Sequence, residues 1–429
     1  MIIRSTRVLL PSGIQPAEIE ITGTQITAVR PFNPDMPTSN TQPPTSALVF
    51  PGIVDTHVHV NEPGRADWEG FATATAAAAA GGVTTIVDMP LNSVPATTTL
   101  RALEAKRRLA PIDGIEVQFW GGVVPGNHDR IDELAAAGVR GFKCFLTPSG
   151  VDDFLPVEPR DLRRALPPIG RWKLPLLVHA EWPASLRPVP ADADPRAYRT
   201  WLASRPPEAE VDAIAALIAL GRETGARIHI VHLATADALP LLRDARAEGL
   251  PITVETCPHY LTFDAGEIPD GATFFKCAPP IRDRATREAL WQALVDGDVD
   301  LIATDHSPCP PAMKGDGDFL AAWGGIASLE LSLAAVWTGA AARGIGVERI
   351  AQWMSEAPAR LAGLDARKGS IEVGKDADLV IWDPDAEFVV DETALRQRHK
   401  RTPYAGRTLR GRVLATCARG RLVYGDTGV

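Results

Sequence analysis

The chain has few cysteines and no spacing that would pair them. Its five cysteines are odd in number, widely scattered and free of CxxC spacing, which argues against a disulfide framework and favours a reducing compartment. One dominant sign of charge is also lacking, because 44 basic and 53 acidic residues give a formal net charge of −9. A mildly acidic chain without a basic run has no electrostatic reason to bind nucleic acid or an anionic membrane.

Long apolar runs are missing as well. Residues 1–5 do not lead into the apolar core and cleavage site of a secretory signal, and the longest Ala-rich stretch, residues 72–83, is too short to cross a bilayer. These absences predict a cytoplasmic protein with neither a nucleic-acid nor a membrane partner. The 429 residues, 45% hydrophobic and 23% charged, suit a large α/β barrel enzyme with a smaller attachment.

Three regions of different pattern follow one another along the chain. Strand-like runs separated by turns come first, and a link rich in Pro, Thr and Ser covers residues 37–46. From residue 54 to about 363, strands alternate with helical segments, which predicts parallel βα units. Short strand-like runs then return. The expected runs at the two ends are 7–10, 17–21, 25–29, 369–371, 377–382 and 412–416.

The predicted fold is α/β: a TIM-like (β/α)8 barrel with a small β-sandwich built from both chain ends. We expect the barrel at residues 51–363 and the two parts of the sandwich at residues 1–50 and 364–429. The eight expected barrel strands are residues 50–55, 83–88, 115–120, 139–145, 174–178, 228–233, 252–256 and 301–304. Helices are expected at residues 69–80, 99–109, 208–224 and 284–295.

Metal-competent side chains stand at the carboxyl ends of these predicted strands. In a parallel barrel the carboxyl ends form the active-site face, so we expect these side chains to meet there. Six such residues are enough for two divalent metals, and two metals suggest hydrolysis. The six candidates are His57, His59, Lys143, His179, His232 and Asp305.

His57 and His59 are two residues apart on one strand, so both side chains point to the same face. Lys143 by itself would be interpreted as a solvated or salt-bridged lysine. It lies, however, on an otherwise apolar strand, where an unpaired ammonium group is costly. Carboxylation by CO2 would convert the amine into an anionic carbamate, and its two oxygens could bridge two metals.

The remaining histidines divide by their position on the strands. His229 and His232 are three residues apart, so only one can face the barrel interior; we choose His232, and interpret His229 as a structural histidine. Glu181 shares the parity of His179 and is a candidate pocket residue. For His259 and His306, support of the ligands and simple loop packing stay equally open.

Several segments resemble the cyclic amidase branch of the amidohydrolase superfamily. They include Asp-Thr-His-Val-His at residues 55–59, Gly-Phe-Lys at 141–143 and Ala-Thr-Asp-His at 303–306. Residues 369–380 are similar to the returning strands of that family's β-sandwich. Within the branch, residues 59–65, 88–93, 141–146 and 323–327 most resemble the allantoinases.

The resemblance implies a binuclear metal centre bridged by carboxylated Lys143. His57, His59 and Asp305 would hold one metal, and His179 and His232 the other. Imidazole and carboxylate ligands suit zinc, cobalt, manganese and iron alike, and zinc is the first expectation. The implied reaction is hydrolysis of the cyclic amide of allantoin to allantoate, and the implied assembly is a homo-oligomer, with a tetramer suspected.

In the expected mechanism, two metals about 3.5–4 Å apart share a hydroxide with a lowered pKa. Asp305 is the expected catalytic residue: it accepts the water proton and delivers it to the leaving ring nitrogen. Substrate hydrogen bonds are expected from Asn92, Ser307 and the backbone of Cys277, although ordinary loop capping would also account for all three.

Asn61 bears on the choice of substrate. Dihydroorotases of the branch carry arginine there, in a His-x-His-x-Arg pattern, to pair with the substrate carboxylate. An amide lacks that cationic fork, so Asn61 counts against dihydroorotase, although Arg65 could compensate. Dihydropyrimidinase or hydantoinase activity is the closest alternative. A mononuclear deaminase would leave Lys143 without a bridging role, and a non-catalytic scaffold would not need all six ligands.

Overall fold

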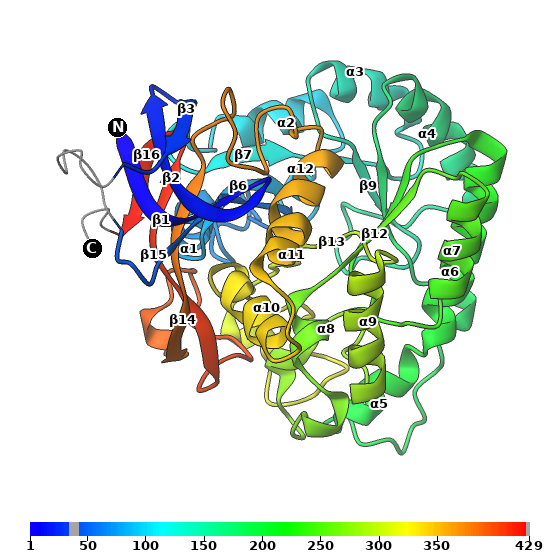
Figure 1. The fold of residues 1–429 in the computed structure, drawn as a ribbon. Helices are drawn as coiled ribbons and strands as arrows, with labels where there is room; N and C mark the ends of the chain where they lie inside the picture. Colours follow the sequence, from blue (N-terminus) through cyan, green and yellow to red (C-terminus); the bar gives the residue numbers. More distant parts are fainter. Residues whose placement is uncertain (34–42, 426–429) are drawn as a thin grey trace.

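The computed structural model describes residues 1–33 and 43–425. The predicted link at residues 37–46 therefore lies partly outside the described residues. Parallel strands form a barrel surrounded by helices, and a β domain packs beside it, as Figure 1 shows. Among the described residues, no helix combines the length and apolar character needed to span a membrane.

The barrel strands follow the predicted alternation. Neighbouring strands are parallel, in the orders β5-β6-β7 and β8-β9-β10-β11-β12-β13. The Thr304 N–H donates to Asp55 Oδ1 at 3.2 Å, and His306 pairs in parallel with Val58, which joins the last strand to the first. The strands are β5 (Ile53–Val58), β6 (Val83–Asp88), β7 (Glu116–Phe119), its continuation β8 (Gly121–Gly122), β9 (Phe142–Phe145), β10 (Leu176–His179), β11 (Ile228–Ile230), β12 (Ile252–Thr256) and β13 (Leu301–Ile302).

Helix ends follow local capping chemistry. The Thr99 side chain accepts a hydrogen bond from the Ala102 N–H at the start of α2, and Asp283 accepts one from Thr286 at the start of α9, which ends at the left-handed Gly297. The helices are α1 (Phe71–Ala80), α2 (Leu100–Arg107), α3 (Ile131–Ala136), α4 (Pro159–Arg171), α5 (Tyr198–Ser204), α6 (Pro207–Thr224), α7 (Leu239–Ala247), α8 (Pro258–Thr262), α9 (Arg284–Asp296), α10 (Ser332–Ala341), α11 (Val347–Ala351) and α12 (Ala357–Leu361).

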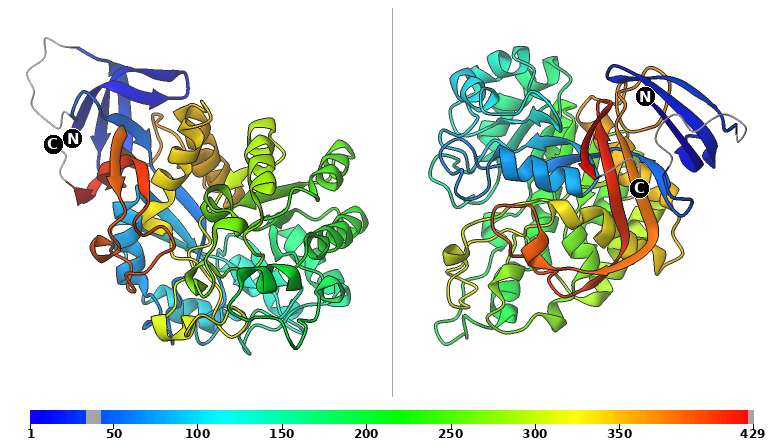
Figure 2. Two further views of the ribbon diagram at one scale, coloured as in Figure 1. Left: turned by 90° about the horizontal axis from the view of Figure 1, so that it is seen from below. Right: turned by 90° about the vertical axis from the view of Figure 1, so that its left-hand side faces the viewer.

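Both chain ends contribute to one β-sheet, seen beside the barrel in the two views of Figure 2. The central contacts are β1 beside β4, in parallel, and β4 beside β14, antiparallel. Within the described residues the order is β16-β15-β14-β4-β1-β2-β3. The strands are β1 (Ile2–Leu10), β2 (Gly13–Thr22), β3 (Gln25–Pro31), β4 (Leu48–Pro51), β14 (Leu379–Val389), β15 (Thr408–Ala418) and β16 (Arg421–Gly425).

The predicted fold class, a barrel with a β domain from both chain ends, is confirmed. One predicted strand, residues 369–371, is wrong: this segment forms a bend, and Gly369 has a left-handed φ of 95°. Ile371 is nevertheless buried in the core of the β domain, which accounts for the strand-like apolar pattern. The domain boundaries at residues 50/51 and 363/364 stay a prediction.

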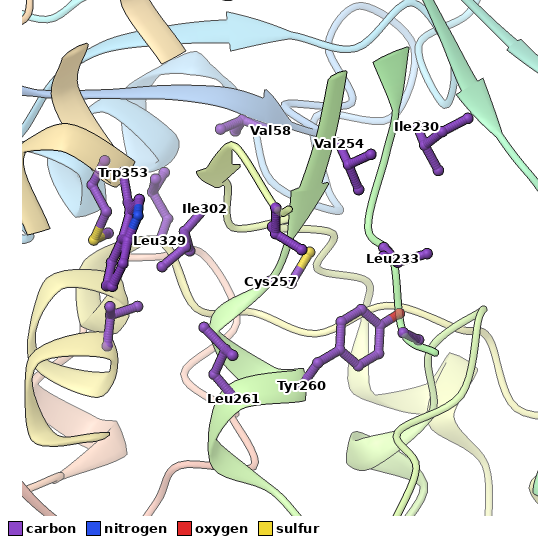
Figure 3. Close-up of a cluster of buried hydrophobic side chains, with 14 of the residues drawn as sticks. Val58, Ile230, Leu233, Val254, Cys257, Tyr260, Leu261, Ile302, Leu329 and Trp353 are labelled. Carbon is purple, nitrogen blue, oxygen red and sulfur yellow. The ribbon is translucent and has the colours of Figure 1, made fainter. Parts of the chain in front are cut away.

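Strand alternation sorts side chains between the helices and the barrel interior. Ile230 and Val254 pack outward in the main apolar core, near Tyr260 and Leu261 of α8, as Figure 3 shows. Glu255 follows Val254 on the same strand, so its side chain points to the opposite side, into the barrel. This alternation places polar groups beneath the carboxyl face.

Candidate metal centre

A pocket of about 280 Å³ lies at the carboxyl ends of the barrel strands. Its walls also include Trp201 of α5, Arg205 at the end of that helix, and Lys276 from the segment between α8 and α9. Every predicted site residue except Lys143 lines it. Those residues are His57, His59, Asn92, His179, His232, Cys277, Asp305 and Ser307.

One half of the pocket gathers His57, His59 and Asp305, whose ligand atoms lie within 4.8 Å of one another. Asp305 Oδ1 is 3.2 Å from His57 Nε2 and 3.3 Å from His59 Nε2. Burial alone would raise the pKa of Asp305, but the neighbouring histidines lower it well below its usual value. A permanent carboxylate with two imidazoles is a donor set that suits a divalent transition metal.

His232 does not lie on a strand, contrary to the predicted strand 228–233, and Asp305 follows its strand at a greater distance than predicted. β13 ends at Ile302 and β11 at Ile230, and the two residues follow in left-handed backbone, with φ of 47° and 42°. Such conformations are uncommon for residues other than glycine and occur often at functional sites. The turn after Asp305 is held by its neighbour His306, whose carbonyl accepts from the His59 N–H at 2.8 Å.

The other half of the pocket pairs His179 with His232. His179 Nδ1 lies 3.0 Å from His232 Nε2, and the His179 ring stacks on Phe145 with centroids 4.5 Å apart. His179 Nε2 contacts Glu181 Oε2 at 2.7 Å, and Arg205 is bonded to the same oxygen. Glu181 thus lies behind His179 and does not line the pocket. Arg205, which directly follows α5, was missed by sequence reasoning.

Lys143 lies buried in β9 and, among the described residues, its Nζ has no hydrogen-bond partner. Its Nζ lies 4.8 Å from the centroid of the Phe145 ring. Burial lowers the pKa of Lys143 to about 8. Burial, then His179 and Lys143, lower the pKa of His232 well below its usual value, while Glu255 and Asp305 of the first half act to raise that of Lys143.

A further carboxylate, Glu255 of β12, was also missed. It contacts His57 Nδ1 through Oε1 and His229 Nε2 through Oε2, the latter at 3.0 Å. Burial alone would raise the pKa of Glu255, but the charge of His57 and the hydrogen bonds from His229 and His57 lower it to about 2. The signal that could have found Glu255 was a carboxylate within the predicted barrel strand 252–256. His229 is hydrogen-bonded, as its structural interpretation requires.

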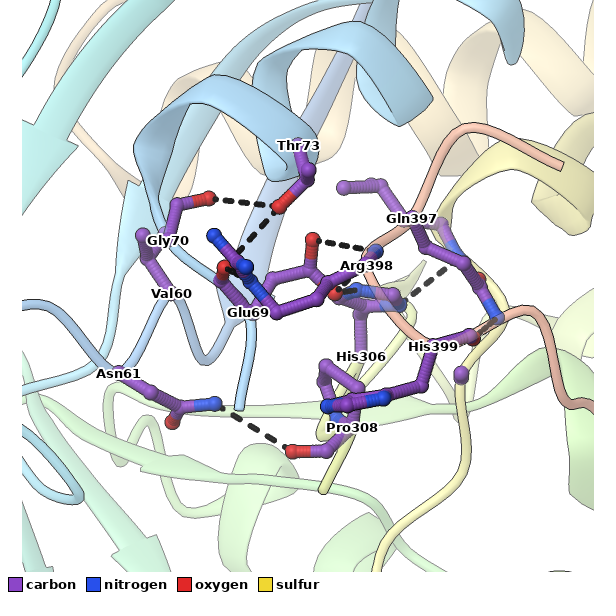
Figure 4. A network of polar contacts seen from close by, with 12 residues as sticks. Val60, Asn61, Glu69, Gly70, Thr73, His306, Pro308, Gln397, Arg398 and His399 are labelled. Carbon is purple, nitrogen blue, oxygen red and sulfur yellow. Dashed lines mark hydrogen bonds and ion pairs between the residues drawn. The ribbon is translucent and has the colours of Figure 1, made fainter. Parts of the chain in front are cut away.

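The turn at His306 is supported from the opposite end of the chain, as Figure 4 shows. His306 Nδ1 accepts from the Ser328 and Leu329 N–H groups at 3.1 and 3.2 Å, so Nε2 carries the proton and faces Glu69 Oε2 at 3.5 Å. The Arg398 N–H in turn donates to Glu69 Oε1 at 3.1 Å. The His306 side chain thus packs against the 328–329 segment and Glu69. His259 is buried, and neither of its ring nitrogens has a partner among the described residues.

The three predicted substrate-binding residues differ in which of their polar groups are already hydrogen-bonded within the protein. Asn92 Nδ2 lies 3.4 Å from His59 Nδ1, and its side chain lines the pocket. The Cys277 carbonyl already accepts from Trp201 Nε1 at 3.0 Å. The Ser307 N–H donates to the Ile326 carbonyl at 3.0 Å, and this leaves its hydroxyl available at the pocket wall.

Neither Asn61 nor Arg65, the two residues that bear on binding of a substrate carboxylate, lines the pocket. Asn61 is buried, with Nδ2 3.4 Å from the Pro308 carbonyl. Arg65 donates to the Asn92 carbonyl at 2.7 Å and stacks 5.0 Å from the Trp68 ring centroid. Arg65 is therefore not in a position to replace the arginine that Asn61 lacks, because it does not line the pocket.

Comparison with known proteins agrees with this geometry. The model of the amidohydrolase family matches residues 48–152 and 195–423. An allantoinase of Streptomyces avermitilis is 50% identical over 99% of this chain and 96% of its own, and one of Arabidopsis thaliana is 43% identical over 99% and 88%. Allantoinase of Saccharomyces cerevisiae is 44% identical over 88% and 82%.

Solved structures show the same architecture. An L-hydantoinase (dihydropyrimidinase) of Arthrobacter aurescens superposes with a TM-score of 0.94 at 30% identity, covering 100% of this chain and 96% of that one. A dihydropyrimidinase of Brevibacillus agri gives a TM-score of 0.88 at 27% identity, covering 99% and 95%.

Proposed function

Since the chain belongs to the amidohydrolase family, we propose that it hydrolyses the cyclic amide of allantoin to allantoate, a step of purine and ureide catabolism. The chemistry rests on one observation: His57, His59 and Asp305 gather at the carboxyl face of a barrel. The choice of allantoin rests on the full-length similarity to proteins that are named allantoinase.

The family implies a divalent metal, and the donor set fits one. We propose two ions, with zinc as first choice and cobalt, manganese or iron as alternatives. His57, His59 and Asp305 would hold one, and His179 and His232 the other. When bound, such ions polarise a carbonyl and lower the pKa of an attacking water. The His179 and His232 nitrogens, 3.0 Å apart, suit lone pairs directed at a shared cation.

Lys143 fits a carbamate bridge for a physical reason. An ammonium group with no hydrogen-bond partner among the described residues is costly inside a barrel. A neutral amine reacts with CO2, and the lowered pKa of about 8 increases the neutral fraction at physiological pH. The resulting anion would offset the charge of two metals.

In the reaction, Asp305 would accept the water proton at its carboxylate and deliver it to the leaving ring nitrogen. Its position between His57 and His59 directs that carboxylate into the pocket. Asn92, Ser307 and the backbone of Cys277 would hydrogen-bond the substrate. Cys277 has the weakest claim of the three, because Trp201 already occupies its carbonyl.

The pocket suits an uncharged ring better than a carboxylate. Its guanidinium, Arg205, is bonded to the fully buried Glu181, so that cation is already neutralised. The Lys276 ammonium donates to the Leu320 and Ala322 carbonyls, and burial, with the nearby Lys314, lowers its pKa to about 8. Among the described residues that line the pocket, dihydroorotate would therefore find no unpaired arginine to bind its carboxylate.

The second candidate is a hydantoinase or dihydropyrimidinase, which the close superposition on such structures favours. The same centre would open a related ring. A homo-oligomer, with a tetramer suspected, a cytoplasmic location and the domain boundaries at residues 50/51 and 363/364 stay part of this proposal.

The test is hydrolysis by purified protein of known metal content, with allantoin, dihydrouracil and dihydroorotate compared at equal concentration. We expect allantoate to form and the other two rings to react far more slowly. An Asp305→Asn variant with the same metal content is the matched control. Preference for dihydrouracil or dihydroorotate would overturn the substrate, and turnover unaffected by metal removal would overturn the chemistry.

A further inference from the structure

A continuous line of buried side chains runs beneath His57, on the floor of the site. His229 of β11 lies between two side chains of β12: its Nδ1 is 2.8 Å from Thr253 Oγ1, and its Nε2 is 3.0 Å from Glu255 Oε2. The other oxygen of Glu255 contacts His57 Nδ1. His229 and Glu255 are both fully buried, so water does not substitute for these contacts.

The sheet register produces this line. His229 is the direct partner of Thr253 across the β11–β12 pair, and Glu255 follows two residues later on the same face of β12. Ile230 and Val254 alternate with them and pack outward against the helices. The polar line is therefore built into the strand pairing and does not depend on loops.

Donor and acceptor roles along the line are fixed by its carboxylate. An ionised carboxylate only accepts hydrogen bonds, so Glu255 requires a proton on His57 Nδ1 and on His229 Nε2. His57 Nε2 is then left with its lone pair on the pocket side, where it lies 3.2 Å from Asp305 Oδ1. Nδ1 of a neutral His229 then accepts a hydrogen bond from the Thr253 hydroxyl group.

We propose that His229 is a positioning residue for the metal centre: it holds Glu255, which in turn fixes the tautomer and ring orientation of His57. The inference rests on the proposed function, since it assumes that His57 binds metal. It assigns to His229 a role beyond filling the barrel interior. A support of this kind typically changes metal affinity or activity by about 10–100-fold.

The experiment measures zinc affinity of the metal-free full-length chain by competition with a chelator, together with its thermal unfolding. His229→Leu keeps bulk but removes both nitrogens. His229→Gln restores a donor near the position of Nε2. Ile230→Ala is the matched control, because it disturbs the same strand on the side that faces the helices. His57→Ala reports the loss of the ligand itself.

We expect His229→Leu to weaken zinc binding by about 10–100-fold and His229→Gln to recover most of that loss. Ile230→Ala should lower the unfolding temperature without changing zinc affinity. The inference is overturned if His229→Leu binds zinc as tightly as the unmodified chain, or if His229→Gln is as weak as His229→Leu. If His57→Ala also leaves zinc binding unchanged, the proposed metal centre itself fails, which separates the two failures.

Discussion

The two halves of the pocket differ in the charged side chains that lie beside their histidines. Around His57, two carboxylates contribute: Asp305 in the pocket and Glu255 beneath it. Beside His179, the carboxylate hydrogen-bonded to the imidazole is Glu181, which is shared with Arg205, and a further neighbour of this half is the cationic Lys143. The first half can hold a cation with protein groups alone, whereas the second lacks an anion.

This difference between the two halves suggests a role for Lys143. Its amine is buried and, within the described part of the chain, without a hydrogen-bond partner. As an ammonium group it would repel a second cation at His179 and His232; as a carbamate it would supply the missing anion to that half. The asymmetry therefore predicts that the two halves respond differently to mutation and to CO2.

The largest effect is expected from Asp305→Asn, which removes the pocket carboxylate of the first half and, with it, the proton acceptor. We expect turnover of allantoin to fall by about 10²–10⁴-fold. The measurement is allantoate formation at matched metal content. Turnover within a factor of a few of the unmodified chain would show that another group moves the proton.

Lys143→Ala should come next, because it removes the only proposed bridge between the halves. The loss should exceed the roughly 10–100-fold that removal of a supporting residue costs, with loss of the metal held by His179 and His232. Added short carboxylic acids should restore part of the activity, since they supply an anion in place of the carbamate. Lys143→Arg keeps a cation that CO2 does not carboxylate, and serves as control. Full activity without added acid would contradict the bridge.

Carboxylation itself should depend on pH with a defined sign. The pKa of Lys143 is lowered from 10.5 to about 8, so the ammonium form dominates below pH 8 and the reactive neutral amine above it. At fixed dissolved CO2, the initial rate of carbamate formation in the metal-free chain follows the neutral-amine fraction and should rise about fivefold from pH 7 to 8 and level off above about pH 9. Carbon-13 spectroscopy with labelled CO2 measures it. A rise that continues towards pH 10.5 would contradict the lowered pKa.

The smallest effect is expected from Arg205→Met, which acts on the second half through Glu181. Without Arg205, the Glu181 carboxylate would lose the contact that holds it in place against His179. We expect zinc affinity and turnover to fall by about 10-fold, with Arg205→Lys in between. Equal loss of both metals would contradict an effect confined to the His179 and His232 half.

Much of this architecture follows from local sequence pattern. Apolar runs that end in a polar residue predict the barrel strands, because burial on both faces and a polar carboxyl end leave few alternatives. His57 and His59 could be placed on one face from their spacing alone. The exact ends of β11 and β13 could not, because the left-handed turns at His232 and Asp305 depend on contacts with other strands.

The supporting residues were harder to predict, for the same physical reason. Glu255 and His229 meet through the register of two strands, Arg205 enters from a loop, and Arg398 reaches Glu69 from the far end of the chain. Each of these contacts joins segments that are distant in sequence. A single sequence shows the residues but not the pairing.

The central claim is that the first half is complete from protein groups and the second requires CO2. The most direct measurement is zinc titration of the metal-free chain, once with CO2 rigorously removed and once with bicarbonate. We predict one tightly bound zinc per chain without CO2 and two with it. Two tightly bound ions in the absence of CO2, or one under both conditions, would contradict the claim.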